Sequence, residues 1–210
     1  MRRPHSLAAA GGTRAEDCAS SEFGRDVQST ERVKTDSLGF LHRALRAATR
    51  SDHMTLDRMM LRFNLGRRED YGLFLNIHYE ALRELEPNWR VEDSDDFQAM
   101  MRCLQNDRRA LRIGTKKIRS TRCGPLTVWN RLGLAYVIRG SRLGSGFLRC
   151  RVPTQFATSY LDVVPSLSWA QFLDQLKIRS EITECDTREV IRGAQFAFDV
   201  FANLTTQALA

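Results

Sequence analysis

The chain lacks the cysteine pattern of a disulfide-stabilised or zinc-binding protein. Its cysteines are odd in number, widely spaced and without a C-x-x-C pair: Cys18, Cys103, Cys123, Cys150 and Cys185. Such a set argues against both a disulfide framework and a zinc site. A reducing compartment fits these free thiols, and we expect a cytoplasmic protein.

Long apolar runs are also missing. No run approaches the roughly 20 residues that cross a bilayer. The Leu-Ala-Ala-Ala run after Arg2 and Arg3 is too brief for a signal peptide. The sequence therefore predicts no membrane association. Strand-like alternation bounded by hairpin turns is absent as well, so we predict an all-α fold.

Length and composition indicate one folded domain. A chain of 210 residues with 42% hydrophobic residues can bury one proper core, whereas two domains would be cramped. Residues 1–36 are poor in large apolar side chains and show no period, so we predict a disordered tail followed by a helical domain over 37–210. Charges balance within that tail, and the formal net charge of +7 belongs to the folded part. A folded domain with a positive net charge implies an anionic partner, which is a small ligand, an acidic protein or a nucleic acid.

A helix predicted to run from Ser37 to a break near Asn64 carries the first candidate site, in residues 41–60. Its residues Arg46, Arg50 and His53 lie at i, i+4 and i+7, so their side chains emerge on one side, beside an apolar stripe that begins with Leu41 and Leu45. An imidazole can bind a metal, and nearby guanidiniums can pair with carboxylates. A flat metal macrocycle with two propionates needs this combination. The alternative is a helix with a solvated basic face and a histidine in its last turn.

The second candidate site is a glycine-rich helix predicted over residues 129–149. Each interior glycine costs a helix roughly 1 kcal/mol relative to alanine, so Gly133, Gly140, Gly144 and Gly146 need a reason. Gly140 and Gly144 face the same way and would let a flat ligand lie on the backbone, or let the helix kink. Close packing against another helix explains them equally well.

Four further helices are predicted from their apolar faces and end signals: residues 68–85, 95–113, a helix opening at Ser168-Trp169, and residues 187–204. His78 lies on the apolar face of the first of these. We interpret it as a hydrogen-bonded core histidine rather than a ligand.

Three stretches together resemble the haem oxygenases, and specifically the bacterial biliverdin-producing branch associated with bacteriophytochromes. Leu45–His53, which reads LRAATRSDH and is followed by Leu56-Asp57, resembles the proximal helix of that family. Ala135–Gly144, which reads AYVIRGSRLG, is similar to the distal helix, and Val190–Phe198 resembles the last helix. The resemblance covers residues 37 to about 206. It implies a single-domain helical bundle that holds haem between a proximal helix and a kinked, glycine-rich distal helix.

The resemblance also assigns roles to individual residues. His53 matches the axial ligand of the haem iron, and Arg46 and Arg50 match basic residues that meet the propionates. Phe198 matches an aromatic residue of the pocket, with Lys177 and Arg179 as further candidates for the propionates. On the distal side the resemblance points to Gly140 and Gly144 over the haem face, and to Ser141 or Arg142 as a donor to ordered water.

The activity implied by the resemblance is oxidative cleavage of haem, which serves as both substrate and cofactor, to biliverdin, carbon monoxide and iron. It consumes O2 and electrons from a ferredoxin- or flavodoxin-type donor, which the positively charged domain would suit. The role implied is either bilin chromophore supply, with a bacteriophytochrome as partner, or iron release.

Two other classes remain open, the first because the chain departs from the family motif. Arg139 stands where the bacterial motif commonly has Glu, Ser145 where a second Gly is common, and Ser141 where animal enzymes carry an aspartate. The departures at Arg139 and Ser145 favour a non-catalytic haem-binding protein of the same fold as the alternative, whereas bacterial relatives of the phytochrome type also lack the aspartate. A nucleic-acid binder is the other rival, because the helix predicted over residues 95–113 and the loop after it carry a basic run: Arg102, Arg108, Arg109, Arg112, Lys116, Lys117, Arg119 and Arg122. We do not expect nucleic acid, since this run has no helix-turn-helix signature.

Overall fold

The computed structural model describes residues 40–112, 126–178 and 183–210. Within these ranges the chain forms helices and connecting turns, with no strand among them. The predicted all-α class is thereby confirmed. The tail predicted for residues 1–36, and the basic loop that carries Lys116, Lys117, Arg119 and Arg122, lie outside the described residues.

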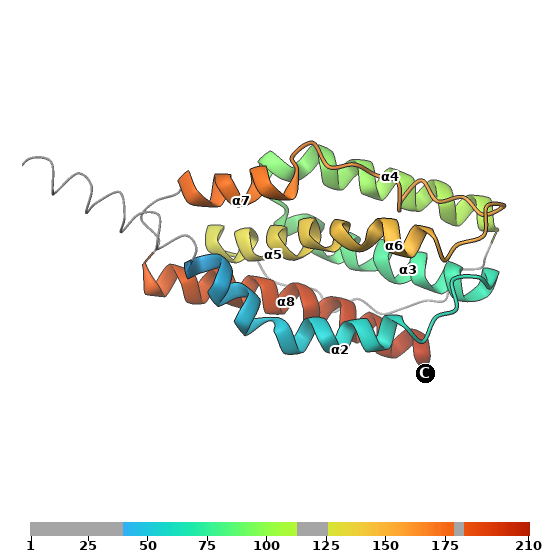
Figure 1. Ribbon diagram of the computed structural model, residues 1–210, viewed down its shortest axis with the longest axis horizontal. Helices are drawn as coiled ribbons and strands as arrows, with labels where there is room; N and C mark the ends of the chain where they lie inside the picture. Colours follow the sequence, from blue (N-terminus) through green and yellow to red (C-terminus); the bar gives the residue numbers. More distant parts are fainter. Residues whose placement is uncertain (1–39, 113–125, 179–182) are drawn as a thin grey trace, which may run out of the picture. The chain divides into compact units, whose positions relative to one another are not determined.

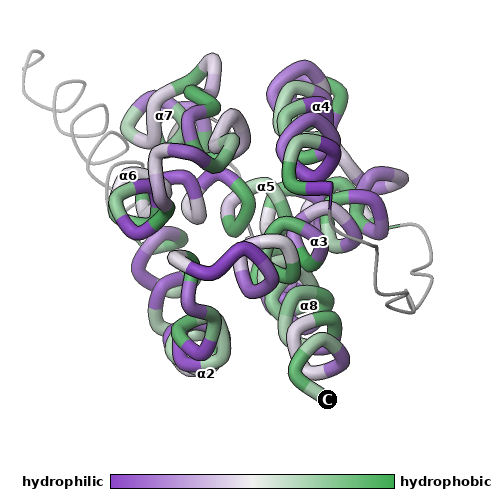
Figure 2. Tube along the Cα trace, turned by 90° about the vertical axis from the view of Figure 1, so that its right-hand side faces the viewer, coloured by the Kyte–Doolittle hydropathy of each residue, from purple (hydrophilic) through white to green (hydrophobic). Residues whose placement is uncertain are grey.

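The longest described helix, α8 (Glu184–Leu209), is the element against which three others pack. These are α5 (Val128–Ser141), α3 (Arg68–Leu85) and α2 (Arg50–Met60) (Figure 1). Their apolar faces meet in the core, where α8 buries Val190, Ala194, Phe198 and Phe201. Figure 2 shows hydrophobic residues dominating α8, with more hydrophilic stretches on α2 and α4.

Two glycines let α5 and α8 approach closely. A Cβ added to Gly133 would lie 1.9 Å from the carbonyl oxygen of Val190, and one added to Gly193 would lie 1.9 Å from that of Asn130. Only a residue without a side chain fits at either place. Close helix packing, the alternative reading for the glycine-rich helix, therefore holds for Gly133.

The remaining elements complete the bundle. After the turns η1 (Glu86–Asn88) and η2 (Val91–Asp93), α4 (Ser94–Leu111) packs against α3. Its C-terminal cap is Arg112, whose φ of 48° lies in the left-handed region that favours glycine. The loop between α6 (Ser145–Arg149) and α7 (Trp169–Ile178) leads back along the bundle (Figure 1).

Some helix boundaries agree with those predicted from the sequence, and others differ by a few residues. The predicted helix over residues 68–85 has the bounds of α3. The last helix begins at Glu184 instead of residue 187, because Thr183 and Asp186 form a capping box. None of the helices in the described ranges has the length and apolar character needed to cross a membrane.

The two helices that carry the predicted site are both interrupted. Residues 40–48 are helical, Thr49 forms a turn, and α2 begins at the next residue. The hydroxyl of Thr49 donates to the carbonyl of Leu45 (2.8 Å). The predicted helix over 129–149 divides into α5, the 3-10 turn η3 (Arg142–Gly144) and α6 (Ser145–Arg149). The predicted helix is therefore interrupted at residues 142–144 by a 3-10 turn.

Candidate functional site

His53 lies on an open face of α2 and pairs with a carboxylate one turn later. Its Nδ1 is 3.0 Å from Oδ2 of Asp57, and the side chains are 64% and 60% exposed. Among the described residues, Nε2 of His53 has no hydrogen-bond partner. A carboxylate that accepts the Nδ1 proton fixes the neutral tautomer whose Nε2 lone pair points outward. This is the arrangement that protein metal ligands commonly have.

Phe198 from α8 forms the inner wall beside this imidazole. The two ring centroids are 6.0 Å apart in an edge-on arrangement, and Phe198 is buried. The contact arises because Leu56 and Met60 of α2 pack toward the core, which brings their side of the helix against α8. The structure thus brings together two predicted site residues that are far apart in the sequence.

The predicted propionate residues on the proximal side are exposed. Within the described ranges neither Arg46 nor Arg50 makes an ion pair, so both guanidiniums have donors available for an anionic ligand. Lys177 is in the last turn of α7, but its side chain lies outside the described part, as does Arg179 altogether.

The two distal glycines have different surroundings. A Cβ on Gly140 would meet the indole of Trp169 at 3.6 Å, which is ordinary van der Waals contact. A Cβ on Gly144 would have nothing within 4 Å, and its neighbours Leu143 and Phe147 are 66% and 68% exposed. An unfilled apolar surface next to a glycine can accept a flat apolar ligand. Gly144 has such open space beside it, whereas Trp169 lies next to Gly140.

The polar distal candidates are bound to backbone carbonyls. The hydroxyl of Ser141 donates to the carbonyl of Ile138 (2.7 Å). Nη2 of Arg142 donates to the carbonyls of Tyr160 (2.7 Å) and Leu161 (3.3 Å). A role for either side chain as a donor to water in the site stays a prediction.

Arg139, which departs from the family motif, belongs to a buried ion network. It is 4% exposed, and its Nη2 is 2.8 Å from both Asp93 and Asp96, while Nε of Arg90 is 2.8 Å from Asp93. Both guanidiniums also face the ring of Phe172. The opposite charges of α4 and its N-terminal turn thus account for an arginine at this buried position.

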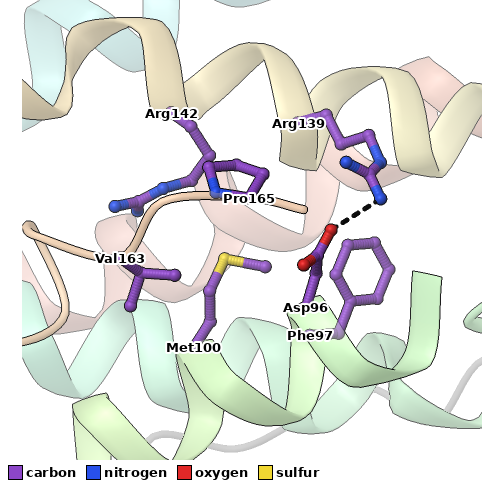
Figure 3. Close-up of a pocket in the computed structure, with 7 residues that line it drawn as sticks. All are labelled: Asp96, Phe97, Met100, Arg139, Arg142, Val163 and Pro165. Carbon is purple, nitrogen blue, oxygen red and sulfur yellow. Dashed lines mark hydrogen bonds and ion pairs between the residues drawn. The ribbon is translucent and has the colours of Figure 1, made fainter. Parts of the chain in front are cut away.

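A small cavity borders this network. It has a volume of about 10 Å³, roughly the room for one water molecule, and its lining includes Asp96, Met100, Arg139 and Arg142. Figure 3 shows Arg139 reaching Asp96 while the guanidinium of Arg142 points elsewhere. The cavity is too small for a macrocycle and is distinct from the face that carries His53.

Two other histidines have surroundings unlike those of His53. His42 lies against Tyr136 (6.0 Å) and Trp169 (6.3 Å), and burial, with the charge of Arg46 as a second cause, lowers its pKa. The imidazole of His42 thus contacts aromatic rings, whereas that of His53 contacts a carboxylate.

His78 is a half-buried, hydrogen-bonded histidine among core aromatic rings, which is close to its predicted role as a core histidine. Its Nδ1 is 2.8 Å from the carbonyl oxygen of Phe74, and its ring packs among those of Phe74, Tyr160 and Phe201. Burial lowers its pKa to about 4, against the opposing effect of the hydrogen bond to Phe74. The imidazole is therefore neutral near pH 7.

Some arginines of the basic run on α4 contact other side chains of the protein. Arg108 donates to Oδ1 of Asn76 (2.7 Å) and stacks on the ring of Tyr79 (4.0 Å), and Arg109 donates to Asn106. An arginine bound in this way has fewer donors for phosphates, which weakens the nucleic-acid alternative.

Sequence reasoning did not assign a role to Asp57. The signal was present, since a carboxylate four residues after a histidine on a helix lies within hydrogen-bond reach of it. Across the described residues, no group of three or more His, Cys, Asp or Glu side chains could hold a metal ion. A single imidazole is, however, sufficient for an iron that already has four macrocycle ligands.

No protein-family model matches this chain, and no curated protein is detectably similar to it.

Proposed function

We propose that the protein is a haem oxygenase that cleaves haem to biliverdin, carbon monoxide and iron. The single observation that carries the proposal is the arrangement of His53, with Nδ1 on Asp57, Nε2 without a partner in the described part of the chain, and Phe198 beside the ring. It supplies what an axial ligand requires: a fixed tautomer, an outward lone pair and an apolar wall.

In this proposal the proximal residues bind and orient the substrate. Nε2 of His53 binds the iron, and the carboxylate of Asp57 accepts the Nδ1 proton and so raises the basicity of the ligand. The exposed Arg46 and Arg50 pair with the propionates, as the resemblance implies. An exposed ion pair contributes only about 0–1 kcal/mol, so these two arginines orient the ring more than they hold it.

On the distal side the backbone leaves space. Gly144 carries no Cβ that would occupy the oxygen side, and the exposed rings and chains of Leu143 and Phe147 can cover the substrate and exclude water. When bound, haem supplies the redox chemistry with O2, and a ferredoxin- or flavodoxin-type protein supplies the electrons. Biliverdin would serve as a bilin chromophore for a bacteriophytochrome, or the released iron would be the useful product.

A non-catalytic haem-binding protein is the second candidate. One observation favours it: the hydroxyl of Ser141 and the guanidinium of Arg142, the predicted distal donors, already bind backbone carbonyls. A site with no distal donor would hold haem without directing oxygen chemistry onto the ring.

Spectroscopy of the full chain loaded with haem separates these possibilities. The loaded protein is reduced without air and then exposed to O2 in the presence of a ferredoxin and its reductase. We expect the Soret band to fade and a biliverdin spectrum to appear. A Soret band that persists through repeated reduction would indicate the haem-binding protein instead.

Histidine variants test the assignment of the ligand. His53→Ala should lose the histidine-ligated spectrum and turnover, with partial recovery on addition of imidazole. His42→Ala is the matched control and should keep both. Loss of the ligand spectrum in His42→Ala alone would show that the assignment to His53 is wrong, and failure of the unaltered chain to bind haem would overturn the proposed function.

A further inference from the structure

Residues 142–149, which we name the distal segment, have few apolar contacts with the rest of the bundle. They comprise η3 and α6, and Ser145 is their one buried residue. Leu148 packs only partly against the core. The position of the distal segment therefore depends on a small number of polar contacts.

Those contacts lead from both ends of the distal segment to one loop, residues 157–162. At the first end, Nη2 of Arg142 donates to the carbonyls of Tyr160 and Leu161, and its guanidinium lies 4.7 Å from the centroid of the Tyr160 ring. At the other end, Nε of Arg149 is 3.5 Å from Oδ1 of Asp162, on a more exposed surface. The Arg142 contact is the shorter and the better shielded from solvent.

The same loop is fixed from its opposite side by α3 and α4. Asp107, which is fully buried, accepts hydrogen bonds from the backbone N–H groups of Ser159 (3.1 Å) and Tyr160 (2.8 Å). The hydroxyl of Tyr71 donates to the carbonyl of Ala157 (3.0 Å). Backbone groups of one residue, Tyr160, thus join α4 to the distal segment through Asp107 and Arg142.

We propose that Arg142 is a positioning residue that sets where the distal segment lies by tying it to the 157–162 loop. The inference rests on the proposed function only for its catalytic meaning, because the distal segment contains Gly144 and would cover the substrate. A planar guanidinium suits this task, since it can reach two carbonyls and stack on a ring at once, which an ammonium cannot do. Arg142 then acts through the backbone that it holds instead of donating to the reacting atoms.

Amide hydrogen exchange of the full, haem-free chain tests directly whether Arg142 holds the distal segment to the 157–162 loop. A hydrogen bond to a charged group is worth enough to change an opening equilibrium about tenfold or more. We expect Arg142→Gln to speed exchange in peptides from the distal segment at least tenfold and to leave those from α8 unchanged. Arg142→Lys should have an intermediate effect, and Arg102→Gln, on an exposed side of α4, should have none. Unaltered exchange in Arg142→Gln or, should that variant not fold, in Arg142→Lys would overturn the proposal.

Carbon monoxide binding to the reduced, haem-loaded protein adds a second readout. A displaced distal segment should let carbon monoxide enter several times faster in Arg142→Gln, with Arg142→Lys between it and the unaltered chain. A change in these rates without a change in exchange would show that Arg142 contacts the ligand itself, which contradicts a positioning role. If the unaltered chain binds no haem, the proposed function fails. The exchange experiment still shows whether Arg142 holds the distal segment to the 157–162 loop.

Discussion

The carboxylate of Asp57 lies 3.0 Å from Nδ1 of His53, one helical turn away on α2. Partners of this kind typically change metal affinity by about 10- to 100-fold when they are removed. We therefore expect Asp57→Ala to weaken haem binding by about that factor, measured by titration. The iron–histidine stretching frequency of the reduced protein should fall as well, because the ligand becomes less basic.

Asp52→Ala is the control for that variant. Asp52 lies in the first turn of the same helix, and its charge acts on Asp199 of α8. Its removal should leave haem affinity and the stretching frequency unchanged. Equal effects of the two substitutions would mean that the charge of α2 matters in general and that the pairing with His53 does not.

Gly144 and Gly146 form a matched pair for testing the distal face. An added Cβ would meet nothing within 4 Å at either position, yet two residues along a helix point to nearly opposite sides. Both leucine variants should fold with stability close to that of the unaltered chain. Gly144→Leu should bind haem but lose most turnover, measured as biliverdin formation, whereas Gly146→Leu should retain it. Undiminished turnover in Gly144→Leu would place the oxygen side elsewhere.

Gly133 tests the close approach of α5 and α8. Its added Cβ would meet the Val190 carbonyl at 1.9 Å, so the helices must separate in Gly133→Ala. Overpacking of this kind costs about 1–3 kcal/mol or more and exceeds the gain of about 1 kcal/mol in helix propensity. We expect a net loss of about 2 kcal/mol in the free energy of unfolding, measured with urea.

Gly140→Ala is the control, since it lies in the same helix and its added Cβ would make only ordinary contact with Trp169. It should leave the free energy of unfolding unchanged or raise it by up to about 1 kcal/mol. A Gly133→Ala variant as stable as Gly140→Ala would contradict the close packing of α5 on α8.

His78 predicts how stability changes with pH. Its pKa is about 4 in the folded chain and 6.5 in its ordinary state, so the unfolded chain binds the proton more readily between these values. The contribution of the neutral imidazole to the free energy of unfolding is therefore fully present above pH 6.5. It falls as the pH drops from 6.5 to 4, and it changes no further below pH 4. The size of the loss is on the order of 3 kcal/mol.

Urea unfolding at a series of pH values measures this effect. His78→Phe, which keeps an aromatic ring among Phe74, Tyr160 and Phe201, should remove the part of the slope between pH 6.5 and 4 that the imidazole causes. An identical slope in this variant would assign the pH dependence to other groups, such as the buried Asp107, whose pKa is raised by burial.

The sequence by itself determined the elements whose signals are local. The apolar face and end signals of residues 68–85 were enough to predict the bounds of α3, and the spacing of Arg46, Arg50 and His53 was enough to propose a binding face. Both depend on the 3.6-residue period, which nearby residues fix without knowledge of the rest of the chain.

Only the tertiary structure decided which distant residues meet. It placed Phe198 against His53, Asp93 and Asp96 around Arg139, and Gly133 against the backbone of α8. A glycine that allows close helix packing and one that leaves space for a ligand look alike in the sequence, since both simply lack a Cβ. What lies opposite that missing atom separates Gly133 from Gly144, and it depends on how whole helices pack.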